Sequence, residues 1–293
     1  MNELISILNS NNLDYNKIKE NSLFRIFDND EVDINFIIPV KNRVSFAKPL
    51  YKSFLAAKAN SNLKIAYTMV EISEANEHQA FCEENEINYV WVKTNYELFN
   101  KCIGLNVGAL FTVKSKSFLF HDIDCLIQSD FFTKLEQNLT TKNAEAIQCF
   151  HGRRVLYLDN TLTNFVINES INVNDLYLGK EGISLPQNIG APGGSIYVTS
   201  DLFFKVGGFE SEFFVANAPE DAFFWDKVDT ISKMHVCDDP EIDIFHMNHI
   251  ATHNTNPHIF EMLKILNMYR AYSKEEKINY INVKSKLINE FRN

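Results

Sequence analysis

Short apolar runs alternate with amphipathic stretches through the first half of the chain. The apolar runs have the length of buried strands and lie at residues 33–40, 63–70, 87–92 and 118–123. The stretches between them carry apolar residues at helical spacing and lie at residues 45–59, 74–84 and 99–113. This alternation predicts an α/β fold with a Rossmann-like, mostly parallel central sheet flanked by helices.

The second half of the chain has a weaker pattern. Residues 130–150 predict a helix and then a strand, and residues 151–185 are rich in Asn, Asp and Thr with little periodicity. This excursion is a binding lid, a disordered segment or a surface elaboration. The remaining predicted elements are a helix at 201–206, a strand at 242–245, a helix from about 257 to 272 and a charged helical tail.

The composition is that of a globular protein, with 45% hydrophobic residues and a net charge of −10. An acidic protein is a poor nucleic-acid binder, because that function needs a basic surface. Five scattered Cys without a CxxC pair indicate reduced thiols in a cytoplasmic protein. The first twenty residues lack the features of a signal peptide. No run approaches the ~18 apolar residues of a membrane span, and peripheral membrane association stays open.

An apolar run ends in His121-Asp122-Ile123-Asp124 within residues 117–130. Two carboxylates at the end of a buried strand are unfavourable unless something neutralises them. A divalent cation that bridges to phosphate oxygens is a common reason for such a pair. The working hypothesis is therefore a nucleotide-sugar site with a metal. The alternative is an ordinary strand end that turns into a loop, where Asp is frequent.

A basic turn, Lys41-Asn42-Arg43, follows the first predicted strand. Ligands of open α/β sheets bind beyond the carboxyl ends of the strands, which places this turn at the same edge as Asp122 and Asp124. Lys41 and Arg43 are therefore candidates for pyrophosphate contacts, and Arg suits bidentate phosphate recognition. Plain solvation of both side chains is the alternative.

Three further motifs lie in the second half. Gly193-Gly194 lets a backbone approach a ligand closely, or simply makes a bend. The pair Glu220-Asp221 lies at the start of a predicted helix. The helix dipole favours carboxylates at this position, even where they have no catalytic or binding role. His246 and His249 are spaced as metal ligands or as surface residues, and a set of Asp with His suits Mn²⁺ better than Mg²⁺. All three motifs are read directly from the sequence.

In order, the blocks resemble the β-1,4-galactosyltransferase family of inverting, metal-dependent glycosyltransferases with the GT-A fold. The blocks are PVKNR, FNKCIGLNVGA, FLFHDID, the Gly pair, GGFE, the Glu-Asp pair, HxxH and NPHIF. The resemblance covers roughly residues 33–260, interrupted at 151–181. It implies a UDP-sugar donor, a saccharide or glycolipid acceptor, and Mn²⁺ or Mg²⁺ as cofactor.

The resemblance also implies roles for individual residues. Asp221 occupies the position of the family's catalytic base, and Glu220 occupies a position in the family's acceptor pocket. Asp124 and His249 occupy the positions of metal ligands in the family, and His246 occupies a position where the family has Met. The implied donor-binding residues are Pro39, Lys41, Arg43, Phe99, Lys101, Asp122, Gly193 and Gly194.

Two departures from the family bear on its substrates. Asn217 stands where the family has a Trp, and this changes the expected acceptor platform. Ala191 stands where galactose-specific members carry a bulkier side chain that crowds the C2 substituent of the sugar. We therefore expect room for an N-acetylated donor, UDP-GalNAc or UDP-GlcNAc, beside UDP-Gal.

The resemblance implies a single GT-A domain over residues 1–293. Its expected parts are a helical extension at 1–30, a nucleotide-binding half at 33–130, an acceptor and metal half at 185–260 and a helical tail at 261–293. The expected function is bacterial capsule or lipopolysaccharide synthesis, in the cytoplasm or at the inner face of the membrane. The alternatives are a GT2-like transferase of other linkage and a non-catalytic nucleotide-sugar or glycan-binding protein.

Overall fold

The computed structural model describes residues 3–95, 97–152, 155–185, 193–216, 218–238, 242–249 and 256–292. The strands are β1 Ser22–Arg25, β2 Val32–Val40, β3 Ile65–Ser73, β4 Asn88–Lys93, β5 Ser115–His121, β6 Cys125–Ile127, β7 Ala146–His151, β8 Val155–Leu158, β9 Ile183–Ser184, β10 Ser195–Thr199, β11 Met234–Cys237 and β12 Ile244–His246. The helices are α1 Glu3–Asn11, α2 Tyr15–Glu20, α3 Val44–Ala59, α4 Gln79–Glu84, α5 Lys101–Phe111, α6 Phe131–Lys142, α7 Asn160–Ile167, the 3₁₀ turn η1 Val173–Asp175, α8 Ser200–Val206, α9 Glu220–Ile231, α10 Ile259–Ala271 and α11 Lys274–Asn289.

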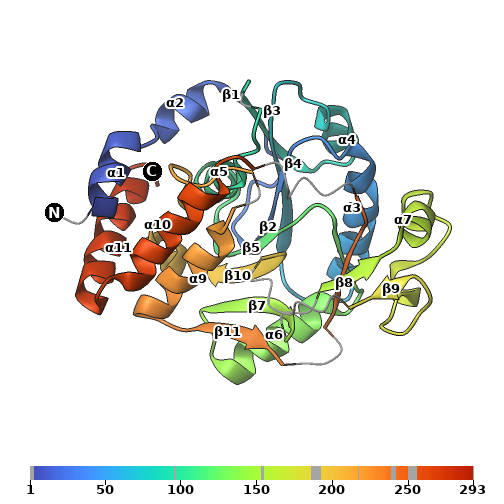
Figure 1. Ribbon diagram of the computed structural model, residues 1–293. Helices are drawn as coiled ribbons and strands as arrows, with labels where there is room; N and C mark the ends of the chain where they lie inside the picture. The colour runs from blue at the N-terminus through green and yellow to red at the C-terminus, as the bar shows by residue number, and fades with distance from the viewer. Residues whose placement is uncertain are drawn as a thin grey trace.

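The central sheet has eight strands in the order β1-β4-β3-β2-β5-β10-β7-β11. Strands β4, β3, β2 and β5 are all parallel to their neighbours in that run, whereas β1 and β10 pair antiparallel. Helices lie on both sides of the sheet, with α3 and α7 on one side and α1, α10 and α11 on the other (Figure 1). The predicted α/β class with a mostly parallel sheet is confirmed.

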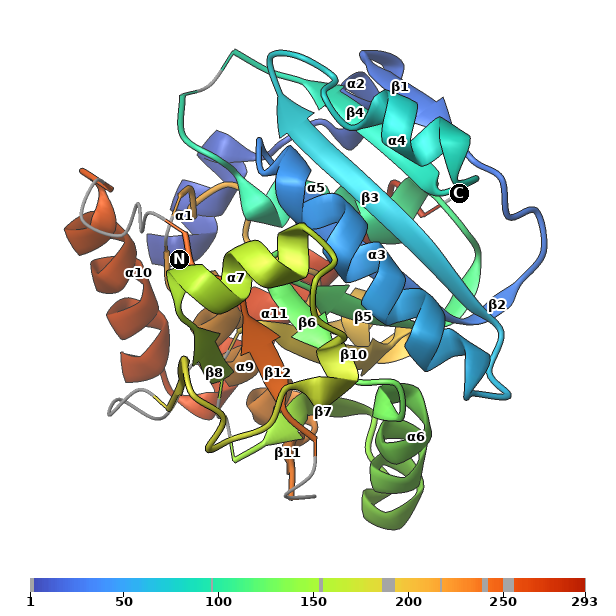
Figure 2. The same cartoon turned by 90° about the vertical axis from the view of Figure 1, so that its right-hand side faces the viewer.

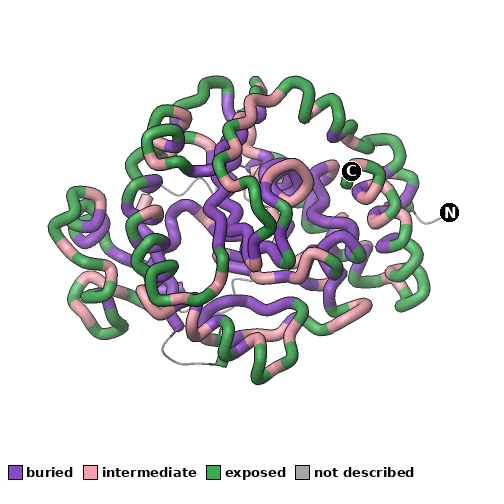
Figure 3. Tube along the Cα trace, turned by 180° about the vertical axis from the view of Figure 1, so that it is seen from behind, coloured by how far each residue is buried: buried purple, intermediate pink, exposed green. Residues whose placement is uncertain are grey.

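Strand β2 is buried on both faces, which explains its nearly unbroken apolar sequence. Phe36 packs on Phe54 of α3, with ring centroids 5.3 Å apart. The next residue, Ile37, points to the other face and lies against Gly108 of α5, where a Cβ would meet its side chain at 2.6 Å. Two separate hydrophobic cores therefore cover the two faces of the main sheet. Figure 3 shows that the buried residues lie in the middle of the molecule.

The structure corrects three details of the sequence-based prediction. Residues 22–25 are not part of a helical extension but form the edge strand β1, paired with β4. The described residues of the excursion at 151–185 form β8, α7 and β9, which excludes the disordered segment among its three interpretations. Helix α4 also begins at Gln79, later than the predicted residue 74.

A smaller sheet in the order β6-β12-β8-β9 joins segments that are distant in the sequence. Strand β6 follows β5 almost directly, and β12 pairs with β6 so that His246 lies opposite Cys125. Figure 2 shows this sheet beside α7, with β12 between β6 and β8. The two sheets therefore meet at residues 122–124, the turn that carries the two aspartates.

Helices α8, α9, α10 and α11 pack together on the side of the main sheet opposite α3 (Figure 1). This packing fixes the start of α9, where the Glu-Asp pair lies. Among the described residues, no helix is both long and apolar enough to cross a membrane.

Candidate active site

The turn after β2 directs Arg43 at Asp124. Asn42 and Arg43 have φ angles of 60° and 65°, in the left-handed region that is unusual for side chains other than Asn and Asp. The Arg43 guanidinium forms an ion pair with Asp124 and lies 5.8 Å from the centroid of the Phe46 ring. A costly backbone conformation therefore places a guanidinium at the aspartate turn.

Asp124, His246 and His249 lie together where β5 ends and β12 ends. The Nε2 atom of His249 is 3.1 Å from one carboxylate oxygen of Asp124, and the Nε2 atom of His246 is 3.7 Å from the other. One ligand atom from each residue lies within 4.8 Å of the others. The backbone N–H of Met247 donates to the Asp124 carbonyl at 2.8 Å, which fixes the histidine segment against the aspartate turn.

The chemistry of this set suits a divalent metal ion. Burial opposes ionisation of Asp124, but the hydrogen bond from His249 and the charges of His246 and Arg43 hold its pKa below the usual range. Burial lowers the pKa of His246 and favours the neutral imidazole that metals bind. The Nδ1 atom of His246 is buried and has no hydrogen-bond partner among the described residues. One carboxylate with two imidazoles fits Mn²⁺ or a similar first-row ion.

Lys101, at the start of α5, joins the aspartate turn to α9. Its ammonium nitrogen lies 2.8 Å from Asp122, 3.2 Å from Asp221 and 3.6 Å from Glu220, measured to carboxylate oxygens. Burial alone would lower the pKa of Lys101, but the three carboxylates raise it well above its ordinary value. This lysine therefore carries the positive charge that lets three acids share one site.

Glu220 and Asp221 are the first two residues of α9, and both are poorly solvated. Burial, reinforced by the charge of Asp221, raises the pKa of Glu220 to about 8. Burial also raises the pKa of Asp221, with the charge of Asp122 adding to the shift and Lys101 opposing it. Raised carboxylate pKa values next to a cation are typical of functional sites, because they match an acid or base to neutral pH.

The glycine pair lies directly beside these acids. A Cβ on Gly193 would fall 1.9 Å from a carboxylate oxygen of Asp221, so no other residue fits there without moving the acid. Gly194 has a φ of 93°, and its carbonyl accepts the backbone N–H of Asp122 at 3.1 Å. The pair thus connects the aspartate turn with the start of α9.

Lys101, the four acids and the two histidines described above form one cluster. Three residues expected at the donor site do not belong to it. Pro39 is buried within β2, facing Gly104 of α5. The Lys41 ammonium donates to the Glu97 carbonyl at 2.7 Å. Phe99 is half-buried among core side chains. Ala191 and Asn217, on which the substrate expectations depend, lie outside the described residues.

Two residues near the cluster were not singled out from the sequence. His121 is buried, its Nε2 atom lies 2.6 Å from the Cys125 carbonyl, and burial lowers its pKa to about 4. The Tyr157 ring packs against His246 in a tilted arrangement, with ring centroids 4.7 Å apart. The only local signal for Tyr157 is the short apolar run at 155–158 within the polar excursion.

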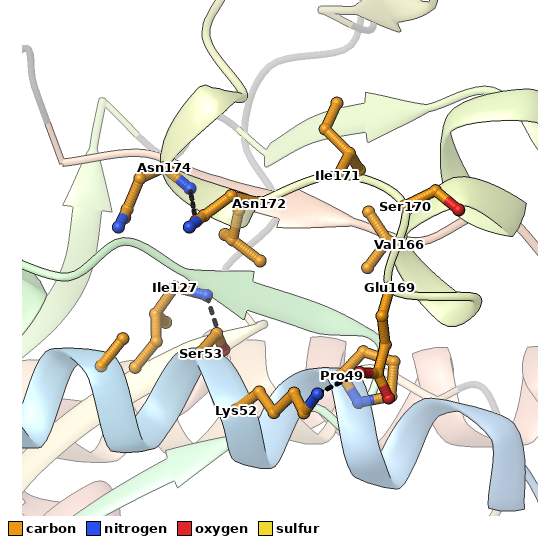
Figure 4. Close-up of a pocket in the computed structure, with 12 residues that line it drawn as sticks. Pro49, Lys52, Ser53, Ile127, Val166, Glu169, Ser170, Ile171, Asn172 and Asn174 are labelled. Atoms are coloured by element: carbon orange, nitrogen blue, oxygen red, sulfur yellow. Dashed lines mark hydrogen bonds and ion pairs between the residues drawn. The ribbon is translucent and has the colours of Figure 1, made fainter.

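A separate cavity of about 360 Å³ lies between α3 and the excursion. Figure 4 shows Lys52 beside Glu169 at one side of it and Ser53 bonded to the backbone of Ile127 at its floor. None of the cluster residues lines this cavity. It is therefore distinct from the candidate active site.

No protein-family model matches the chain, and no curated protein matches it. Among solved structures, TarS of S. aureus has a TM-score of 0.52 at 13% identity, over 84% of this chain but only 41% of the TarS chain. TarS 1–349 in complex with UDP-GlcNAc has a TM-score of 0.52 at 12% identity, over 84% of this chain and 69% of that one.

The catalytic domain of Drosophila β1,4-galactosyltransferase 7, in complex with xylobiose, is similarly close. Its TM-score is 0.51 at 12% identity, over 80% of this chain and 79% of that chain. At such identities the likeness concerns the fold alone. The predicted GT-A fold is confirmed, and the chain resembles both structures to nearly the same degree.

Proposed function

We propose that this chain is a metal-dependent, inverting glycosyltransferase. It transfers a hexose or N-acetylhexosamine from a UDP-sugar to a hydroxyl of a saccharide acceptor and forms a β-glycosidic bond. The observation that carries this proposal is the contact of Lys101 with both Asp122 and the pair Glu220-Asp221, beside the Asp124 and histidine set. A donor site and an acid pair then lie within one connected cluster.

Asp221 serves as the general base that accepts the proton of the attacking hydroxyl. Burial raises its pKa, which makes the carboxylate a stronger base, while the charge of Lys101 opposes this shift and favours the ionised form. Glu220, protonated or hydrogen-bonded, orients the acceptor. Attack on the face opposite the leaving diphosphate turns an α-linked donor into a β-glycoside.

The donor binds across the aspartate turn. Arg43 faces the diphosphate, Asp122 holds the ribose or sugar side, and the bare backbone at Gly193 and Gly194 leaves room for the sugar. Asp124, His246 and His249 would hold Mn²⁺ or Mg²⁺, which supplies Lewis-acid neutralisation of the departing diphosphate.

The likeness to TarS and to β1,4-galactosyltransferase 7 supports the transferase class. TarS has been solved with UDP-GlcNAc, and this favours a UDP-linked hexosamine as donor. The saccharide acceptor belongs to a bacterial surface polysaccharide such as capsule or lipopolysaccharide, met at the inner face of the membrane. A GT2-like transferase of other linkage is the second candidate, because the TarS fold is as similar as the galactosyltransferase fold.

A nucleotide-sugar panel tests the donor assignment. The purified chain is incubated with UDP-Gal, UDP-GalNAc, UDP-GlcNAc and UDP-Glc, each with Mn²⁺ or with EDTA, and UDP release is measured. We expect Mn²⁺-dependent release from at least one donor. Absence of both release and UDP binding contradicts the proposal, whereas binding without release supports a nucleotide-sugar-binding protein.

Asp221→Asn separates catalysis from binding. The amide cannot accept the proton, so turnover should fall by about 10²–10⁴-fold while UDP-sugar affinity stays near that of the wild type. Turnover and isothermal titration with UDP measure the two effects. Glu83→Gln, an exposed carboxylate on α4, is the matched control. Near-normal turnover of Asp221→Asn would remove this residue from the role of base.

A further inference from the structure

An open hollow of about 610 Å³ lies beside the metal-ligand set and belongs mainly to the excursion. Its lining includes Tyr157 of β8, Asp159, Ser184 of β9, and Asn248, which directly precedes His249. We call it the Tyr157 groove. The family resemblance is interrupted at residues 151–181, which include Tyr157 and Asp159, so the role of this hollow has to come from its own chemistry.

The strand register connects the groove to the metal-ligand set. His246 lies opposite Cys125 on one side and Tyr157 on the other, and Tyr157 in turn lies opposite Ser184. Side chains of directly paired residues share one face of a sheet. Neighbouring strands are about 5 Å apart, so Tyr157 and Ser184 lie about one and two strand spacings from His246.

The Tyr157 side chain is available to a ligand. The residue is 38% exposed, and the hydroxyl has no hydrogen-bond partner within the described ranges. The ring lies against the His246 imidazole, with the two ring planes tilted by 32°.

The polar groups around the ring define the class of ligand. Asp159 uses one carboxylate oxygen to cap α7, and Ser184 is exposed with its hydroxyl unbonded in the described structure. Asn248 adds a side-chain amide, one N–H of which donates to the Asn160 side-chain oxygen at 2.8 Å. The described lining contains an acid and no Lys or Arg, so it disfavours a phosphate group.

Given the glycosyltransferase function proposed above, we propose that the Tyr157 groove binds a pyranose ring of an uncharged acceptor oligosaccharide. The C–H face of the sugar packs on Tyr157, while Asp159, Ser184 and Asn248 bind its hydroxyl groups. An aromatic ring with a few placed polar groups is the usual composition of such a site. The groove thus selects an extended glycan over a monosaccharide.

The test begins with the full chain, loaded with Mn²⁺ and UDP, on an array of neutral oligosaccharides of two to six units. The strongest binder is then titrated into the wild type, Tyr157→Ala, Tyr157→Phe and Tyr177→Ala. Tyr177 is a matched control, because it lies on the same excursion, is 60% exposed and does not line the groove. UDP affinity is measured in parallel for every variant.

We expect Tyr157→Ala to weaken saccharide binding about tenfold or more, since the stacking ring is lost. Tyr157→Phe should stay within about threefold of the wild type, and Tyr177→Ala should not change. Unaltered saccharide binding by Tyr157→Ala overturns the inference. A variant that loses UDP or Mn²⁺ affinity instead overturns it too, because Tyr157 then only supports His246.

The outcomes also separate this inference from the function on which it rests. A wild-type chain that binds UDP with Mn²⁺ but no array saccharide overturns the groove assignment and leaves the nucleotide site intact. A wild-type chain that binds neither UDP nor any nucleotide sugar contradicts the proposed function itself.

Discussion

Single side chains around the aspartate turn have strongly different surroundings. Asp122 is paired with Lys101, whereas Asp124 faces Arg43 and two imidazoles. The neighbouring His121 forms no ion pair with the described residues, and its ring packs against Phe36 in a tilted arrangement with centroids 4.9 Å apart. This histidine is therefore structural, while the two aspartates on its carboxyl side are available for chemistry.

The buried His121 makes stability depend on pH. Its pKa is about 4 in the folded chain and ~6.5 when unfolded, so below pH 6.5 the unfolded state binds more protons. The free energy of unfolding should consequently fall by about 2 kcal/mol from this group between pH 7 and pH 5. Urea unfolding of the wild type and His121→Gln at both pH values measures the difference. Equal pH dependence in the two proteins would contradict this assignment.

Helix α9 presents the Glu-Asp pair, and buried charges anchor it two turns later. The Lys227 ammonium contacts the Glu210 carboxylate and the Gly208 carbonyl, and both charged side chains are fully buried. From α11, the Tyr280 hydroxyl donates to Glu210 at 3.4 Å. The C-terminal helices thus fix the position of α9, and through it the orientation of Asp221.

Breaking this pair should destabilise the chain. Lys227→Met leaves Glu210 buried without its cation, a loss of about 3–5 kcal/mol in unfolding free energy. The double variant Lys227→Met with Glu210→Gln removes both charges and should recover more than half of that loss. Urea unfolding measures all three proteins. A single variant as stable as the double variant would show that the pair is not energetically coupled.

Elements with strong local patterns could be predicted from the sequence, and those defined by distant partners could not. Strand β2 is a nearly continuous apolar run, so the hydrophobic pattern alone predicts it. Strands β8 and β9 have little pattern of their own, because their place is set by β12, which comes much later in the chain. The same limit applies to Lys101, whose contacts with Asp122 and Asp221 depend on the tertiary fold.

At the scale of the whole molecule, the candidate site lies where two sheets meet. The main sheet brings Arg43 and Asp122 from the carboxyl ends of β2 and β5, and the smaller sheet adds His246. Because the chain has a net charge of −10, its overall field repels a diphosphate. The attraction for a diphosphate must therefore come from local positive groups such as Arg43. The architecture agrees with the GT-A fold, and the residue roles remain predictions to be tested.

The central claim is a metal-dependent nucleotide site built on Asp124. Isothermal titration of UDP into the wild type, Asp124→Ala and the exposed control Asp175→Ala, with Mn²⁺ or with EDTA, tests it most directly. We predict that Mn²⁺ tightens UDP binding at least about tenfold, or 1.4 kcal/mol, in the wild type and the control, and not at all in Asp124→Ala. The same Mn²⁺-dependent affinity in Asp124→Ala, with the variant folded by circular dichroism, would contradict the account.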